Sequence, residues 1–410
     1  MLVILAWRNI WRNVRRSTII IAAITAGVMS GLFASSLMFG LSESMVNSTI
    51  DRDLGHFQIH TPTFEDEKLL TDTIPSAATV IERAGHSRAV RGISPRVIIE
   101  GMGSSASTSN GVRIVGIDPA KEKTVTNIYR QLAVGSYFDS TRSASVRRAN
   151  QIVIGQKLAD NLGIRERSKI ILSFQGLDGT IIYGAFRVTG IFRTESSMFD
   201  RTTVFVRESD LFALLNTAPV YHEIAVRLSA DKFLDSASVP LRHELPALSV
   251  KTWKDLAPEL KLLDELVGLQ LNIFLGIILF ALLFGITNTM LMAVMERVRE
   301  FGVLMAIGMK RRRVFVMIIM ETLALSLVGG LLGMAFAAVL IAYVGRVGID
   351  LSAFSQGFTE WNMSPILQPE LPFEFYLSIT VMIIVTAIFS AIYPALKAVR
   401  LKPAHAIRSF

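Results

Sequence analysis

Four long apolar stretches constrain the fold of this 410-residue chain more than any other feature. They cover residues 17–41, 271–295, 314–344 and 376–393. A helix needs about 20 mostly apolar residues to cross the hydrocarbon core of a bilayer, and each stretch is close to or above that length. Between the first two stretches, the sequence has the composition of an ordinary globular domain. It therefore predicts four transmembrane helices and one large soluble insertion.

The basic residues predict how the helices are oriented in the membrane. The chain has 42 Lys and Arg against 34 Asp and Glu, and its densest basic clusters flank the apolar stretches. Because cytoplasmic loops are enriched in Lys and Arg, this distribution indicates membrane topology rather than nucleic-acid binding. The loop 345–375 has one Arg and four acidic residues. Both chain ends and the loop 296–313 are therefore expected in the cytoplasm.

The predicted organisation follows from these spans. A cytoplasmic interfacial elbow helix (1–16) precedes the first transmembrane helix (17–41), an extracytoplasmic α+β domain (42–270) and the second transmembrane helix (271–295). A cytoplasmic loop (296–313), the third transmembrane helix (314–344), an extracytoplasmic loop (345–375), the fourth transmembrane helix (376–393) and a cytoplasmic tail (394–410) follow. Pro394 is expected to disrupt the fourth helix at its end.

The first apolar stretch could instead be a cleaved signal peptide, but it is longer than a typical leader core. Before it, Trp7, Ile10, Trp11 and Val14 recur at helical spacing among arginines. This pattern predicts an amphipathic helix whose indoles lie at the headgroup level. A disposable leader has no need of such a helix, so a retained transmembrane helix is favoured.

Strand-like runs and helical patterns alternate in the predicted outer domain, which indicates an α+β fold. Strands are expected at 55–60, 95–100, 111–117, 169–173, 181–191, 203–206 and 223–228, and helices at 156–162, 208–216 and 230–244. The Gly- and Ser-rich stretch 101–111 predicts a hairpin tip or flexible loop, and 140–150 an exposed loop or subdomain joint. Apolar residues at helical spacing over 256–271 predict a helix that continues into the second span. This helix could carry movement from the membrane to the outer domain, or it could be a packed helix with no moving role.

No motif typical of an enzyme is present in the sequence. The chain has no Cys, no P-loop and no Gly-x-Ser-x-Gly elbow. His56 and His60 could bind a metal, but no further ligand is near them in sequence, and surface strand positions explain them equally well. We therefore expect no catalytic residue, metal site or cofactor in this chain.

The loop 296–313 is unusually apolar for a connector between two spans. Its apolar residues recur at helical spacing: Val298, Phe301, Leu304, Met305 and Ile307. The pattern predicts a short amphipathic helix with a C-cap near Gly308. Such a helix either lies on the membrane surface or docks in a groove of a partner that pushes on it.

The segment ERVREFGVLMAIGMKRRRVFVMIIMETLALSLVGGLLG (296–333) resembles the signature of the FtsX/MacB superfamily of ABC transporter permeases. YPALKAVRLKPAHAIR (393–408) resembles its C-terminal motif, and LAWRNIWRNVRRS (5–17) its elbow helix. Two further segments are similar to the MacB-like periplasmic domain, especially that of LolC/LolE-type lipoprotein-releasing permeases: IVIGQKLADNLGI and FRVTGIFRTESSMFDRTTVFV. The resemblance covers nearly the whole chain.

This resemblance implies a homo- or heterodimeric permease in the bacterial inner membrane, working with two separate ATPase subunits that bind ATP and Mg. It implies mechanotransmission, in which closure at the cytoplasm moves the periplasmic domain. The residues that match the coupling helix of the family are Glu296, Arg297, Glu300, Phe301, Leu304, Met305 and Gly308.

Three cargo alternatives remain within the family. The first is lipoprotein extraction to a periplasmic carrier. The second is MacB-like export of a drug, peptide or toxin with an adaptor and an outer-membrane channel, and the third is FtsX-like regulation of cell-wall hydrolases. Extraction is favoured because FtsX-type chains have a smaller outer domain, and MacB usually fuses its ATPase to the permease, whereas this chain starts at the elbow helix.

Lipoprotein extraction predicts two further sites. Pliable apolar side chains should line a lipid cleft between the first two spans: Met29, Phe33, Leu37, Met38, Phe39, Leu271, Phe274, Ile277 and Phe280. These residues could equally face lipid or pack a dimer. By position, a tight hairpin matches the carrier-binding hairpin of LolC-type relatives, with Gln175, Leu177, Asp178, Gly179 and Tyr183. An ordinary β-hairpin is the alternative.

Small residues and one charge stand out within the spans. Gly27 and Gly31, and also Gly329 and Gly333, form small-xxx-small faces that permit close helix contact, either across a dimer or within one subunit. Glu321 lies in the third span, where a charge is costly, so snorkelling or pairing with an Arg is expected.

Overall fold

The computed structural model describes residues 14–64, 68–138, 150–351 and 366–400. Most of the predicted elbow helix (1–13 of 1–16), the predicted loop 140–150 except its last residue, and the tail beyond 400 lie outside these residues. The chain divides into two compact units. The membrane unit comprises Met1–Glu43, Leu263–Asp350 and Ile366–Phe410, and the sheet unit comprises Ser44–Leu262 and Leu351–Pro365.

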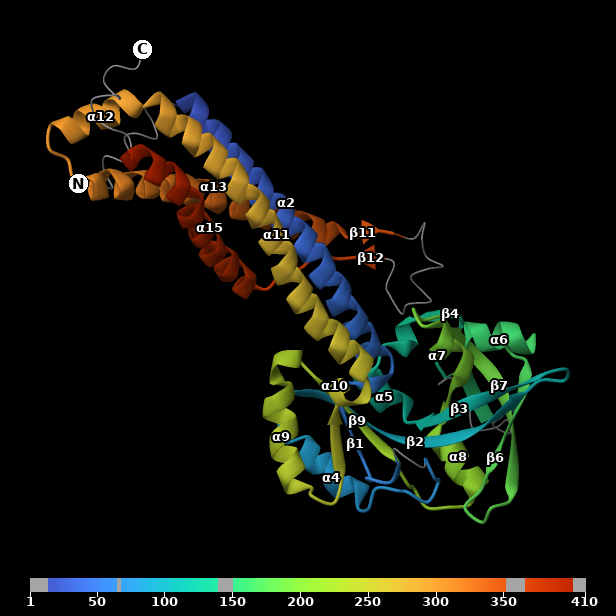
Figure 1. Cartoon of the computed structure of the whole chain (residues 1–410). Coiled ribbons are helices and arrows are strands. Elements are labelled where there is room, and N and C mark those ends of the chain that lie inside the picture. The colour runs from blue at the N-terminus through green and yellow to red at the C-terminus, as the bar shows by residue number, and fades with distance from the viewer. Residues whose placement is uncertain (1–13, 65–67, 139–149, 352–365, 401–410) are drawn as a thin grey trace. The chain divides into compact units, whose positions relative to one another are not determined.

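Four helices long and apolar enough to cross a membrane are found among the described residues, as predicted. They are α2 (Val14–Thr49), α11 (Pro258–Glu296), α13 (Arg311–Val347) and α15 (Phe373–Arg400), with the short α12 (Val298–Ala306) between α11 and α13 (Figure 1). A small sheet of β11 (Ile349–Asp350) and β12 (Ile366–Leu367) follows α13. Each long helix exceeds its predicted span. The helix expected from 256–271 into the second span is continuous from Pro258 onward, whereas Leu256 ends a separate short helix.

The predicted disruption at Pro394 is wrong, because α15 continues to Arg400. Proline has no N–H to donate to the carbonyl four residues before it, which is that of Ser390. The hydroxyl of Thr287 on α11 donates to this carbonyl oxygen at 3.1 Å. A neighbouring helix therefore supplies the hydrogen bond that proline removes, which lets the helix continue in an apolar environment.

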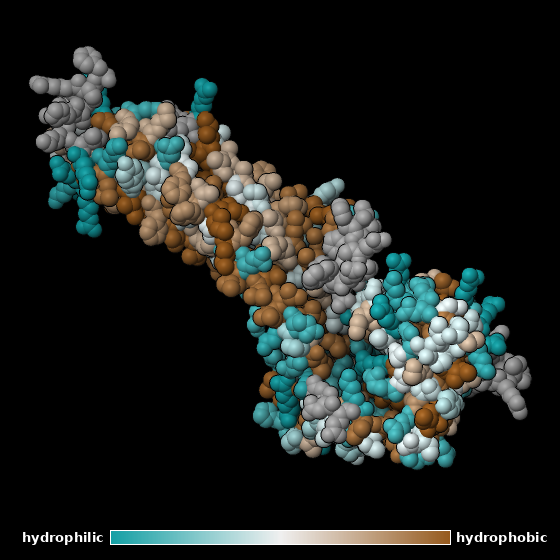
Figure 2. Space-filling view, turned by 45° about the vertical axis from the view of Figure 1, so that its right-hand side comes forward, coloured by the Kyte–Doolittle hydropathy of each residue, from teal (hydrophilic) through white to brown (hydrophobic). Residues whose placement is uncertain are grey.

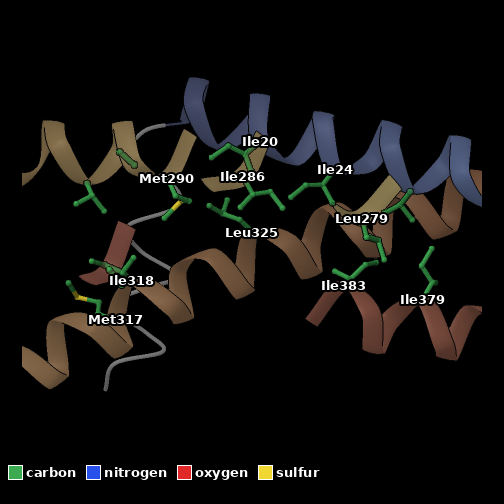
Figure 3. Packing of buried hydrophobic residues seen from close by; sticks show 14 of the residues in the cluster. Ile20, Ile24, Leu279, Ile286, Met290, Met317, Ile318, Leu325, Ile379 and Ile383 are labelled. Carbon is green, nitrogen blue, oxygen red and sulfur yellow. The ribbon is translucent and has the colours of Figure 1, made fainter. Parts of the chain in front are cut away.

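Apolar side chains from all four long helices form the core of the membrane unit. Ile20 and Ile24 of α2 extend toward Leu279 and Ile286 of α11, and Ile383 of α15 lies in the same cluster (Figure 3). On the face shown in Figure 2, brown and tan apolar residues make up most of the surface of this unit. Such an outer surface suits contact with lipid.

The glycine faces pack within one subunit. A Cβ at Gly329 would lie 2.9 Å from Ile24, and one at Gly333 2.9 Å from Val28, so α13 meets α2 at close range. Gly27 and Gly31 of α2 face leucine and isoleucine side chains of α11 in the same way. Of the two alternatives for these faces, the structure shows the one inside the subunit.

The sheet unit contains ten of the strands. They are β1 (Phe57–His60), β2 (Val90–Ser104), β3 (Ser109–Ile117), β4 (Leu132–Gly135), β5 (Asn150–Gly155), β6 (Lys169–Gln175), β7 (Ile181–Phe192), β8 (Thr203–Arg207), β9 (Glu223–Leu228) and β10 (Ser249–Thr252). Pairing runs β2–β3–β8–β5–β7–β6 and back to β2, so six strands close a ring. Outside the ring, β9 pairs with β2, β1 with β9 and β10 with β1, while β4 pairs with β7.

Helices cover this sheet and complete the predicted α+β fold. They are α4 (Ala77–Ala84), α5 (Pro119–Val125), α6 (Gln156–Leu162), α7 (Ser197–Thr202), α8 (Glu208–Leu215), α9 (Leu234–Glu244) and α10 (Trp253–Leu256), with the short turns η1 (Ile50–Leu54), η2 (Ile128–Arg130) and η3 (Asp231–Phe233). One apolar cluster takes residues from all six ring strands and from α6 and α8. A second joins β1, β9, β10, α4 and α9.

Every strand and helix expected in the outer domain is present, α6 and β9 with the expected bounds and the others with shifted ends. The stretch 101–111 is mostly strand, because β2 extends to Ser104 and β3 starts at Ser109, which leaves 105–108 as the hairpin tip. The prediction missed β4, β5 and β10 and the short helices α4, α5, α7 and α10.

Candidate functional site

The predicted amphipathic helix of the cytoplasmic loop is α12. Gly308 follows it with φ +103, and its N–H donates to the carbonyl of Met305 at 3.1 Å. The N–H of Met309 donates to the carbonyl of Leu304 at 3.0 Å. Glycine adopts positive φ without steric cost, so Gly308 provides the expected C-cap.

The apolar face of α12 is divided between the inside and the outside of the bundle. Phe301 is 1% exposed in the core of the membrane unit, and Leu304 and Met305 pack against that core. Val303 and Ile307 are exposed, Ile307 at 80%. Phe301 can therefore act on a partner only through the helix that it anchors, whereas Ile307 is available for contact.

The charged residues of the predicted coupling site differ in whether they face solvent or the neighbouring helix α13. Glu296 and Glu300 are exposed, whereas the side chain of Arg297 turns toward α13. Glu321 of α13 accepts two hydrogen bonds from Arg297 Nη1, at 3.0 and 3.1 Å. The expected pairing of Glu321 with an Arg is confirmed.

The nine predicted cleft residues differ in how far they are buried within one subunit. Leu271 is fully buried, and Met29 and Phe33 pack against the core of the membrane unit. Ile277 and Phe280 are exposed on α11. The other four are partly buried: Leu37, Met38, Phe39 and Phe274. Within one subunit Leu271 is thus closed to a ligand, whereas Ile277 and Phe280 are open, and the lipid cleft stays a prediction.

The predicted carrier hairpin is the connection between β6 and β7. Gly179 has φ +81, and Asp178 Oδ1 accepts hydrogen bonds from the N–H and the hydroxyl of Thr180 at 3.1 and 2.7 Å. Gln175 starts the turn on an exposed strand end. The hydrogen bonds of Thr180 hold the pKa of Asp178 below its ordinary value, so this turn stays charged near neutral pH.

An apolar surface runs along this hairpin onto the sheet. Leu177, Ile181 and Tyr183 are exposed, Tyr183 at 69%, and so are Ile171 of β6 and Met102 of β2. The strand register puts Ser173 between Met102 and Tyr183, so the residues lie on neighbouring strands. We call these five residues the hairpin surface. The sequence did not single out Met102 or Ile171, since the run IILSF does not tell which of its apolar residues face outward.

His56, just before β1, and His60, at its end, are buried, contrary to the surface positions considered for them. Leu228 N–H donates to His56 Nδ1 at 3.2 Å, and His60 Nε2 lies 3.0 Å from Gln58 Oε1. Among the residues that the structure describes, no group of three His, Cys, Asp or Glu could hold a metal ion. These side chains are thus part of the hydrogen-bonded interior of the sheet unit.

A buried ion network inside the sheet unit was not found from the sequence. The fully buried Arg96 donates to both carboxylate oxygens of Glu122, at 3.1 and 2.7 Å, and also contacts Glu223. Arg113 donates to Asp53 at 2.9 Å and to Glu223 at 3.3 Å. The neighbouring arginines lower the pKa of Asp53 against the opposing effect of its burial. Asp53 belongs to η1, so this network holds the segment after α2 against β2, β3, α5 and β9.

These features define a polytopic membrane protein that carries a large α+β domain between its first two spans. An FtsX-like permease C-terminal model matches residues 272–403, and a MacB-like periplasmic core domain model matches residues 17–239. The chain belongs to the FtsX/MacB superfamily of ABC transporter permeases.

Several known proteins are similar to the chain. The macrolide export ATP-binding/permease protein MacB of Escherichia coli is 22% identical over 67% of this chain and 43% of its own length. MacB of Chlorobium luteolum is 32% identical over 30% of this chain and 16% of its own length. The uncharacterized ABC transporter permease YvrN of Bacillus subtilis is 24% identical over 54% of each chain. The match thus spans less than two thirds of these relatives.

Two solved structures are similar to part of the chain. The extracellular domain of the ABC-type transporter YknZ from Gram-positive bacteria is 13% identical, with a TM-score of 0.34 over 48% of this chain and 99% of that domain. The periplasmic region of MacB from Actinobacillus actinomycetemcomitans is 11% identical, with a TM-score of 0.35 over 51% of this chain and 94% of that region.

Proposed function

We propose that the chain is the permease subunit of a dimeric, ATP-driven complex of the bacterial inner membrane that extracts lipoproteins and passes them to a periplasmic carrier. ATP and Mg would bind to two separate ATPase subunits. The observation that carries the proposal is the hairpin surface, which offers exposed apolar side chains to a soluble partner. Exposed apolar residues that gather on neighbouring strands mark a site of protein interaction.

The energetics of acyl chains explain why such a partner is needed. Each methylene contributes about 0.8 kcal/mol to membrane binding, so one chain of about 16 carbons would cost on the order of 12 kcal/mol to expose to water. Extraction therefore requires an apolar acceptor close to the site of release. A carrier docked on the hairpin surface would fulfil that requirement.

A reconstituted complex tests the proposed cargo. The permease and an ATPase encoded beside it would be placed in liposomes with a triacylated lipoprotein, a soluble carrier and ATP. We expect the lipoprotein to move to the carrier, and Tyr183→Asp to reduce this transfer at unchanged ATPase activity. Met198→Asp is the matched control, because Met198 is exposed on α7 outside the hairpin surface. ATP hydrolysis without any lipoprotein release would exclude extraction.

MacB-like export is the second candidate, and the names of the relatives in Escherichia coli and Chlorobium luteolum favour it. ATP-dependent movement of a macrolide or peptide in the same liposomes, with no lipoprotein transferred, would support export. The two candidates share the permease, the ATPase and the mechanical step, and differ in cargo and in the partner outside.

The division of α12 predicts which residues contact the ATPase. Ile307→Asp should abolish association with the ATPase while the permease keeps its thermal stability, because this side chain contacts no core. Phe301→Asp should instead destabilise the membrane unit by several kcal/mol, since it buries a charge among apolar residues. Thermal unfolding and co-purification of the two variants separate these effects. Normal association of Ile307→Asp would show that this face of α12 is not the docking surface.

A further inference from the structure

Arg297 occupies the break between α11 and α12. It has φ −102 and ψ 13, so the backbone leaves the α-helical path at this residue. Its N–H donates to the carbonyl of Val294 at 3.2 Å, and its own carbonyl accepts from the N–H of Phe301 at 3.1 Å. The conformation of this single residue therefore sets the angle between the two helices.

The side chain of Arg297 contacts two further groups besides Glu321 of α13. Its Nε donates to Glu300 Oε2 of α12 at 3.0 Å. Its guanidinium lies 5.2 Å from the centre of the Phe301 ring, which is itself fixed in the core. One guanidinium thus joins the break, α12 and α13.

The two carboxylates that Arg297 contacts differ in their exposure to solvent. The Glu321 side chain is 10% exposed and that of Arg297 13%, whereas Glu300 is 45% exposed. An exposed ion pair contributes little, but the loss of one partner of a buried pair leaves an uncompensated charge. Glu321 also lies ten residues after the start of α13, about 15 Å along the helix axis. The contact with Glu321 is therefore the one that restrains Arg297.

We infer that Arg297 and Glu321 form a clamp that fixes the angle between α11 and α12, so that a displacement of α12 moves α11 and α13 with it. Both are positioning residues, because the surface that would contact the ATPase lies elsewhere on α12, at Val303 and Ile307. The source of the displacement rests on the proposed function. The clamp itself is a property of this chain and needs no partner to be measured.

Distance measurements on the full chain test the clamp. The chain has no Cys, so spin labels can be attached to cysteines introduced at Ala306 of α12 and Met292 of α11, both exposed. In lipid nanodiscs without nucleotide, we expect one narrow distance distribution. Glu321→Leu should broaden or shift it, because Arg297 loses its buried partner. The matched control Glu300→Leu, which removes the exposed carboxylate from the same guanidinium, should leave it unchanged.

A charge exchange shows whether the ion pair itself is responsible. Arg297→Glu combined with Glu321→Arg, in the Glu300→Leu background to avoid repulsion between acids, should restore the narrow distribution. This variant also decides the matter if Glu321→Leu does not fold. An unchanged distribution in Glu321→Leu, or a broad distribution or unfolded protein after the exchange, would overturn the inference. Since no ATPase is present, failure of the clamp is distinguishable from failure of the proposed function.

Discussion

His222 shows how single residues of the sheet unit depend on a neutral, hydrogen-bonded interior. Ile98 N–H donates to its Nδ1 at 3.1 Å, and Nε2 lies 3.0 Å from the carbonyl oxygen of Leu70, to which it donates. This arrangement requires the neutral tautomer with the proton on Nε2, because protonation of Nδ1 would break the bond from Ile98. Burial lowers the pKa of His222.

The lowered pKa of His222 predicts a loss of stability in acid. The unfolded chain binds the proton more readily than the folded one, so the stabilisation is complete above about pH 6.5 and falls as the pH drops below it. Thermal unfolding of the full chain in detergent should show that His222→Gln lowers stability at pH 7.5 by about 1–3 kcal/mol, the cost of an unsatisfied buried group. It should also reduce the loss between about pH 7 and 5 relative to the parent chain.

The comparison with the parent chain is needed because another group titrates in the same range. Burial raises the pKa of Asp200 to about 6, so this carboxyl contributes with the opposite sign and stabilises the fold as the pH falls. His86→Gln is the control, since His86 is an exposed histidine of the same unit. An identical pH dependence in His222→Gln and His86→Gln would contradict the assignment.

The sequence predicted the residue types of the candidate site better than their surroundings. It placed Phe301 and Ile307 on one amphipathic helix, but periodicity does not tell which apolar residue faces the bundle and which faces a partner. The pairing of Glu321 with an Arg was expected from the cost of a charge within a span, yet the partner depends on how α12 folds back on α13. The network around Arg96 joins residues more than 100 positions apart, such as Glu223. No local pattern encodes that contact.

At the scale of elements, the sequence predicts a helix reliably where composition alone determines it. It predicts a helix less well where a contact with another element determines where the helix ends. The four spans follow from length and hydropathy. The continuation of α15 past Pro394 depends on a hydroxyl of α11, which the sequence of α15 does not contain. Similarly, β5 was missed because the pattern does not reveal that Asn150–Gly155 pairs between β7 and β8.

A double-mutant cycle tests this contact between α11 and α15. Thr287→Val should destabilise the chain by about 1 kcal/mol, the usual value of an interhelical hydrogen bond in a membrane. In Pro394→Ala the new N–H can bond to the Ser390 carbonyl, so adding Thr287→Val there should cost much less. Thr289→Val is the matched control, because its hydroxyl bonds within α11 to Gly285. Thermal unfolding of the four chains in detergent gives the coupling energy, and additive effects would disprove the compensation.

At the scale of the whole molecule, the two units differ in how their interiors are built. The membrane unit is held by apolar packing and close glycine contacts, with Arg297–Glu321 as a buried ion pair. The sheet unit adds the network of Arg96, and that network includes η1, which continues directly from α2. Along the chain, α2 and α11 each start in one unit and end in the other, so these two helices are the covalent links through which the proposed movement would pass.

The orientation of the chain is the prediction on which this organisation depends. Ile307 and Tyr183 are both exposed, and their cysteine variants would each carry the only thiol in the chain. In intact spheroplasts, a membrane-impermeant maleimide should label Tyr183→Cys and not Ile307→Cys, because the positive-inside bias predicts that the basic loop lies in the cytoplasm. Inside-out vesicles should give the reverse. Labelling of Ile307→Cys from outside would put α12 beyond the reach of any cytoplasmic ATPase.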